Sequence, residues 1–236
     1  MINDTSLQVV TRNATALTLS MHPGTARFRL REPVSIRIDG QELSGPRPGS
    51  DRSWNCSLVR KGERWIQGKA DAKGLRKRHG LQGPIDDALM DSFVFVLPSG
   101  KSSHPLVESW VQAEMKRAVE HWRRHFRGDA RVKVDTAVTP EEIATANLVL
   151  WGDSESNQLV KRIAGDLPIA WSSEQIHVGE RTYDAKHHVP IMVYPNPLNP
   201  QRYVVLNSSF TYRDYAYLNN ARQVPMLPDW AIVDLR

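Results

Sequence analysis

Alternating apolar and polar positions run through the first part of the chain and predict short β-strands. The alternation occurs at residues 7–11, 16–20, 34–38, 54–59 and 64–66. The dipeptide Asp39-Gly40, a common hairpin turn, follows the third of these segments. Short strands with a period of two are typical of a small antiparallel sandwich. We therefore expect residues 1–68 to form a small β-sandwich-like domain.

After residue 91 the pattern changes to apolar residues that follow one another without interruption. Runs of this kind lie at residues 93–97, 147–151, 189–194, 203–206 and 230–233. An unbroken apolar run indicates a strand that is covered on both faces, as in a parallel sheet.

Helical patterns separate these runs. Apolar residues between positions 105 and 126 keep the spacing of one buried helix face. Thr139 and Glu142 form a capping box that predicts a second helix. Further helices are expected through residues 159–163 and near residues 213–221.

Strands that alternate with helices favour a mostly parallel sheet with right-handed crossovers. We therefore expect an α/β protein in which residues 92–236 form a three-layer domain of Rossmann-like or flavodoxin-like type. Residues 69–91 are mostly polar, basic and glycine-containing, and we interpret them as a linker that wraps or joins the two domains.

Composition narrows the class of protein. The chain has 236 residues, of which 40% are hydrophobic and 24% are charged, so it can bury a core without disulfides. Its one cysteine, Cys56, excludes an internal disulfide. No apolar run approaches the roughly 18 residues of a membrane span. Residues 1–5 lack the basic and apolar regions of a signal peptide. We expect a soluble protein with no membrane span.

The positive charge is diffuse. The formal net charge is +5, and the one dense basic run lies at residues 75–79. Nucleic-acid binding usually needs a longer basic stripe or interleaved aromatic residues, so we expect no nucleic-acid partner.

Polar residues follow the predicted strands and are candidates for ligand binding. They are Ser99, Asp153, Asn157, Asn196 and Asn207. In an open α/β sheet, ligands bind beyond the carboxyl ends of parallel strands, where these side chains would converge. The alternative is that they are helix caps and turn formers. The chain has no G-x-G-x-x-G and no complete P-loop, which argues against a nucleotide site.

Two clusters suggest chemistry. Asp86, Asp87 and Asp91 lie close together in sequence, and a hard cation such as calcium binds several carboxylates at short spacing. The alternative is a capped, buried turn. No other cofactor is indicated.

Ser154 follows a strand at a turn into a helix, where a serine can be an exposed nucleophile. His187 could act as its base, with Asp184 orienting the imidazole ring. The blocks Gly152-Asp153-Ser154 and Asp184-x-x-His187 resemble two signature blocks of GDSL-type esterases, although the intermediate Gly-x-Asn-Asp block is not found. The alternative is a helix cap at Ser154 and a polar loop around His187.

Longer segments resemble a second family. Four segments are similar to the C-terminal region of bacterial prolyl-oligopeptidase-like serine hydrolases of the α/β-hydrolase superfamily. They are residues 81–93, residues 147–153 with Asn157, residues 189–207 and residues 217–225. In that family the catalytic residues are expected in an upstream domain, and this chain has no G-x-S-x-G nucleophile elbow. The resemblance implies a non-catalytic accessory module and an exported bacterial parent protein.

Three hypotheses follow. The first is an accessory module of an ester- or peptide-cleaving enzyme, whose partner is a serine-hydrolase domain or a second copy of this chain. The second is a small hydrolase of esters or lactones that uses Ser154 or a metal-activated water. The third is carbohydrate or peptide binding through some of the seven tryptophans.

Overall fold

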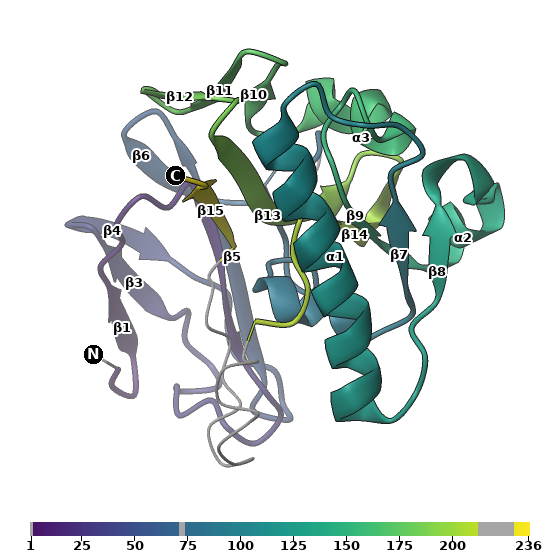
Figure 1. Cartoon of the computed structure of the whole chain (residues 1–236). Helices are drawn as coiled ribbons and strands as arrows, with labels where there is room; N and C mark the ends of the chain where they lie inside the picture. Colours follow the sequence, from purple (N-terminus) through teal and green to yellow (C-terminus); the bar gives the residue numbers. More distant parts are fainter. Residues whose placement is uncertain (1, 71–73, 212–228) are drawn as a thin grey trace. The chain divides into compact units, whose positions relative to one another are not determined.

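The structure, a computed structural model, describes residues 2–70, 74–211 and 229–236 (Figure 1). The chain divides into two compact units, Met1–Gly74 and Leu75–Arg236. The division falls inside the segment 69–91 that was predicted as a linker. From Leu81 onward, side chains of that segment pack in the hydrophobic core of the second unit.

The described part of the first unit contains six strands in two small sheets. One sheet has the order β1-β3-β4 and the other the order β2-β5-β6. Leu7, Ile36, Trp54, Leu58 and Trp65 share one buried cluster. The strand bounds are Ser6–Val9 for β1, Ala16–Met21 for β2, Ser35–Ile38 for β3, Gln41–Ser44 for β4, Trp54–Lys61 for β5 and Arg64–Gln67 for β6.

Two details of this unit differ from the prediction. Strand β4 was missed because Leu43 is its only apolar residue, although the Asp39-Gly40 turn before it has the positive φ angles of a hairpin turn. Strands β1 and β3 are parallel, whereas an antiparallel sandwich was expected. They can be parallel because β2, in the other sheet, lies between them in sequence and leaves a long connection.

A six-stranded mixed sheet organises the second unit, in the order β15-β13-β14-β9-β7-β8. Strands β14, β9, β7 and β8 are parallel to one another. The mostly parallel direction was predicted for β7, β9 and β14, whereas β8 was not predicted as a strand. Strand β13 is antiparallel to both β14 and β15, so the predicted parallel direction is wrong there. The bounds are Phe93–Leu97 for β7, Val132–Val134 for β8, Asn147–Leu150 for β9, His188–Asn196 for β13, Asn199–Leu206 for β14 and Trp230–Asp234 for β15.

Alternate residues of the central strands pack in different clusters. Phe93 and Phe95 lie in one cluster with residues of α1, whereas Val94 and Val96 lie in another with residues of α3. Successive side chains of a strand point to opposite faces, so both faces of this sheet are covered. The helices are α1 over Pro105–Phe126, α2 over Pro140–Thr145 and α3 over Gln158–Ile163, with 3₁₀ turns at Ile85–Leu89, Asp135–Ala137 and Ala164–Asp166.

A second, smaller sheet interrupts the chain between α3 and β13. It has the order β10-β11-β12 and consists of Ala170–Trp171, Gln175–Val178 and Arg181–Asp184. Among the described residues, strands make up 35% and helices 21%, so the described part of the fold is dominated by sheets.

The predicted helix near residues 213–221 lies outside the described residues. In the part of the chain that the structure describes, no helix combines the length and the apolar character needed to cross a membrane.

Candidate functional site

The carboxyl ends of β7, β9 and β14 meet at one edge of the main sheet, because these strands are parallel neighbours. The loops that follow them begin at Pro98, Trp151 and Asn207. Strand β13 runs the other way, so its first residue, His188, lies at this same edge. This edge is where an α/β sheet binds ligands.

Asn207 joins two of these loops. Its backbone has a positive φ of 49° and its side chain is 2% exposed. Gly152 N donates to Asn207 Oδ1 at 2.8 Å, and Asn207 Nδ2 donates to Gly152 O at 3.0 Å. Both ends of the amide are therefore used to connect the loop after β14 to the loop after β9.

Asp153 and Asn157 hold the loop between β9 and α3. Asp153 Oδ1 accepts hydrogen bonds from the backbone N–H groups of Glu155 and Ser156 and from the Ser156 hydroxyl. Asn157 caps α3, since its Oδ1 accepts from Leu159 N and Val160 N, while its Nδ2 donates to the carbonyl of Trp151. These bonds are those of turn formers and helix caps.

The other two predicted binding residues do not join this group. Ser99 is exposed in the loop after β7, and its neighbour Gly100 donates its N–H to Ser156 O at 2.8 Å. Asn196 lies at the opposite edge of the sheet, because β13 is antiparallel to β14 and Asn196 pairs with Asn199 at the hairpin. The expectation that Asn196 converges with Asn207 is therefore wrong.

Ser154 lines a small cavity together with Asp153, His104 and His188. The volume of this cavity is about 10 Å³, which is room for about one water molecule. Trp171 and other residues of the β10–β11 segment form one of its walls. Within the described residues Ser154 has no hydrogen bond to a histidine.

His187 and Asp184 form a pair of their own. His187 Nδ1 lies 3.2 Å from Asp184 Oδ2, and Asp184 Oδ1 accepts from Lys186 N. That backbone hydrogen bond, followed by His187, lowers the pKa of Asp184 below its usual value. His187 does not line the cavity of Ser154, whereas the next residue, His188, does. The structure therefore brings Ser154 near His188 rather than the predicted His187.

The three aspartates that suggested a calcium site have separate partners. Both carboxylate oxygens of Asp86 accept from Thr211, Asp87 accepts from the Tyr203 hydroxyl, and Asp91 pairs with Arg202. Burial, followed by the contact with Asp87, raises the pKa of Tyr203 to about 12. Across the described ranges, no group of three or more His, Cys, Asp or Glu side chains is arranged to hold a metal ion. The calcium-site hypothesis is therefore wrong for Asp86, Asp87 and Asp91.

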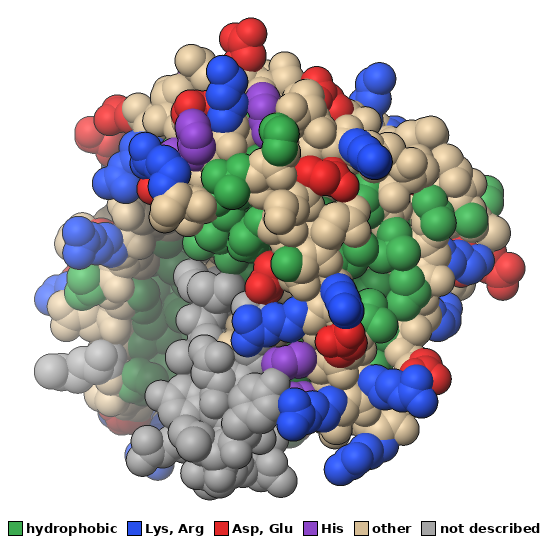
Figure 2. Space-filling view, in the orientation of Figure 1, with side chains coloured by type: hydrophobic (Ala, Val, Ile, Leu, Met, Phe, Trp, Pro, Cys, Tyr) green, Lys and Arg blue, Asp and Glu red, His purple; other side chains and the backbone are tan. Residues whose placement is uncertain are grey.

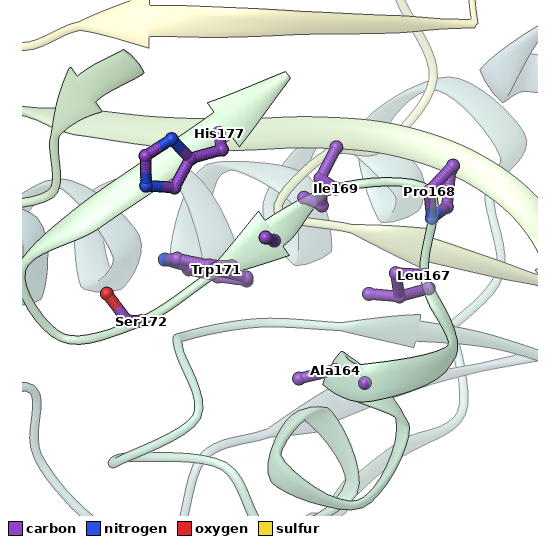
Figure 3. Close-up of a pocket in the computed structure, with 9 residues that line it drawn as sticks. Ala164, Leu167, Pro168, Ile169, Trp171, Ser172 and His177 are labelled. Atoms are coloured by element: carbon purple, nitrogen blue, oxygen red, sulfur yellow. The ribbon is translucent and has the colours of Figure 1, made fainter. Parts of the chain in front are cut away.

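Two larger cavities flank the β10–β12 sheet. One has a volume of about 590 Å³ and a polar lining that includes Ser103, Glu155, Glu174, Thr182, Tyr183 and Lys186. The other, of about 720 Å³, has a more apolar lining that includes Trp171 and His177 (Figure 3).

Of the side chains that line these cavities, Asp184 was a predicted site residue and Trp171 was one of the seven candidate tryptophans, whereas the others were not predicted. Two signals in the sequence nevertheless pointed to the hairpin that carries several of them. Ile176 and Val178 alternate with polar residues, and Gly179, at a φ of 60°, begins the turn between β11 and β12.

Charged groups on the face shown in Figure 2 are interspersed, with Lys and Arg side chains among Asp and Glu. This distribution agrees with the diffuse charge inferred from the sequence. The absence of a nucleic-acid partner stays a prediction.

The sequence was compared with protein-family models and with curated proteins, and neither comparison found a match.

Proposed function

We propose that this chain is a non-catalytic accessory module that associates with a serine hydrolase. The observation that carries the proposal is the small size of the cavity that Ser154 lines, about 10 Å³, which is room for about one water molecule. A nucleophilic serine also needs a base within hydrogen-bond reach, and the described residues provide no such bond to Ser154.

The hydrogen bonds at the carboxyl edge of the sheet also support a non-catalytic role. The side chains of Asp153, Asn157 and Asn207 form their hydrogen bonds with backbone groups of the loops at this edge. A catalytic or substrate-binding group must instead present a free donor or acceptor to the substrate. The resemblance to the C-terminal region of prolyl-oligopeptidase-like hydrolases supplies the partner, either a serine-hydrolase domain or a second copy of this chain.

Two further proposals accompany this one. We propose that the second unit belongs with three-layer α/β domains of Rossmann-like or flavodoxin-like type, which the hydrophobic clusters on both faces of its sheet support. We also propose that the parent protein is an exported bacterial hydrolase, on the strength of the resemblance.

A second candidate function, hydrolysis of small esters, is favoured by the shared cavity of Ser154 and His188. The His188 ring is fixed by a contact of 2.9 Å between its Nδ1 and Asp184 O. His188 Nε2 lies 3.9 Å from Asp234 Oδ2, so the imidazole ring would have to turn toward Ser154 before Nε2 could take the proton of Ser154 as its Oγ attacks the ester carbonyl. The alcohol would leave with that proton, and water would release the acid from the acyl-serine.

The two candidates are separated by an assay of the full chain with p-nitrophenyl acetate and p-nitrophenyl butyrate. The accessory role predicts no turnover above the rate in buffer, and the same result for Ser154→Ala. Turnover that disappears in Ser154→Ala and in His188→Ala, but persists in the matched control His187→Ala, would overturn the accessory role and establish the esterase.

A further inference from the structure

We propose that the cavity beside β10 binds the ring of a neutral sugar. Its volume of about 720 Å³ lies in the usual range for small-molecule sites. Residues of the segment after α3 and of strands β10 and β11 line it, among them Ala164, Leu167, Pro168, Ile169, Trp171 and His177 (Figure 3).

The lining favours a neutral ligand. None of the residues that line this cavity is Asp, Glu, Lys or Arg, although 24% of the chain is charged. A charged ligand would lose part of its hydration there without gaining a group of opposite charge.

The walls of the cavity suit a flat apolar surface. Trp171 is half-buried, with part of its side chain packed against the cluster that contains Leu167 and Ile169. In Figure 3 the indole ring is seen nearly edge-on, with Ala164 on the far side of the space below it. One face of a pyranose ring carries mainly C–H groups, which pack well on an indole.

The edge of β10 adds a donor and an acceptor. Ser172 N donates to Gln175 O at 2.9 Å, and Ala170 pairs with His177 two residues earlier. Hydrogen-bonded pairs alternate in an antiparallel ladder, so the N–H and C=O of Trp171 point away from β11. Strand β10 is the edge of its sheet, and no other described strand pairs with it there.

His177 completes the polar rim. Its Nδ1 lies 2.9 Å from Thr182 Oγ1, which fixes the ring, and the residue is exposed. A sugar hydroxyl both donates and accepts, so several hydroxyls around one apolar ring face match this mixture of donors and acceptors. A simple aromatic compound could stack on the indole of Trp171, but it would form no hydrogen bonds with His177 or with the edge of β10.

This inference does not depend on the accessory role. Ester hydrolysis by the chain would overturn the accessory role and leave the sugar site standing, whereas the titrations below test the sugar site alone.

The test is a calorimetric titration of the full chain with cellotetraose, xylotetraose and maltotetraose, and with tetragalacturonate as the charged comparison. We expect at least one neutral tetrasaccharide to bind, and tetragalacturonate to bind more weakly. Trp171→Ala should lower the affinity by about tenfold or more, since stacking on an aromatic ring contributes on this scale. Trp230→Ala, at a tryptophan that is 50% exposed and does not line the cavity, should leave the affinity unchanged.

A second variant covers the case in which Trp171→Ala unfolds. Ala164→Leu should narrow the space opposite Trp171 and weaken binding, and its matched control, Ala144→Leu on exposed helix α2, should not. The proposal is overturned if none of the three neutral tetrasaccharides binds. It is also overturned if Ala164→Leu binds as tightly as the wild type, or if Trp230→Ala weakens binding as much as Trp171→Ala does.

Discussion

The Asp86 carboxyl is buried at 4% exposure, and Thr211 donates to both of its oxygens. Burial outweighs these hydrogen bonds and raises the pKa of Asp86 above its usual value. The folded chain therefore holds this proton more tightly than the unfolded chain does. By linkage, the contribution of Asp86 to stability is fully present below the unfolded pKa of about 3.9 and is lost as the pH rises through the folded pKa.

Replacing Asp86 by Asn should remove this dependence. We expect the free energy of unfolding of the wild type, minus that of Asp86→Asn, to decrease from about pH 4 upward until the folded pKa is passed. Urea denaturation of both proteins over this range measures the difference. Asp91→Asn is the control of opposite sign, because the N–H of Ser92 and then Arg202 lower the pKa of Asp91. Its contribution to stability is present above about pH 4 and is lost as the pH falls below that value, so the control is measured below pH 4. Parallel curves for wild type and Asp86→Asn would contradict the prediction.

Gly152 is a second residue whose identity the fold restricts. Its φ is +103°, and a Cβ at this position would collide with the Ser156 hydroxyl. We expect Gly152→Ala to lower the free energy of unfolding by about 2 kcal/mol or more, as strain and steric conflict add. The control is Gly128→Ala, where an added Cβ meets nothing within 4 Å. Equal urea midpoints for the two variants would show that the loop adapts.

At the scale of elements, the hydrophobic pattern predicted the long helix and the strands that are continuous apolar runs. Helix α1 and strand β7 have the predicted bounds, because 22 residues of helical spacing and five apolar residues in a row leave little ambiguity. Strand β8 has three residues, too few for a pattern. The direction of β13 was predicted incorrectly, because an apolar run shows neither which strands it pairs with nor whether the pairing is parallel or antiparallel.

The candidate site was only partly predictable for a different reason. Asp153, Asn157 and Asn207 lie at the edge where the sequence placed them. Their residue types serve equally as caps and as ligands, so sequence could not decide between the two roles. The proximity of Ser154 to His188 depends on where β13 begins, which only the pairing of the strands reveals.

The capping box of α2 offers a test at the same scale. Thr139 Oγ1 accepts from Glu142 N at 3.2 Å, and Thr139 N donates to Glu142 Oε2 at 2.9 Å. We expect Thr139→Ala to lower the free energy of unfolding by about 1 kcal/mol, the usual effect of losing a helix cap. Thr139→Ser keeps the hydroxyl and should stay close to wild type. Identical thermal midpoints for all three proteins would mean that this cap does not stabilise α2.

At the scale of the whole molecule, the two units have separate hydrophobic cores. The cluster of the first unit contains residues between Leu7 and Trp65, and both clusters of the second begin beyond residue 80. Each core can therefore be weakened without removing contacts from the other.

Ile36→Ala tests this independence, since Ile36 is fully buried in the first core. Its truncation should lower the stability of the first unit by about 2 to 5 kcal/mol. Amide hydrogen exchange should accelerate in β3 and β5, while exchange in β9 and β14 stays at the wild-type rate. Acceleration in all four strands would indicate that the chain unfolds as one cooperative unit.

The side chain of Asn207 copies a peptide group, since it accepts from Gly152 N and donates to Gly152 O. At position 207, aspartate would lose the N–H donor, and serine would have a single oxygen both to accept from Gly152 N and to donate to Gly152 O. Glutamine is longer than asparagine by one methylene group. Gly152 and Asn207 should therefore be kept unchanged when the loops at this edge of the sheet are redesigned. The exposed Glu155 can be randomised to introduce new binding groups. Libraries that vary position 152 or 207 would mostly yield chains in which the loop after β9 is no longer hydrogen-bonded to the loop after β14.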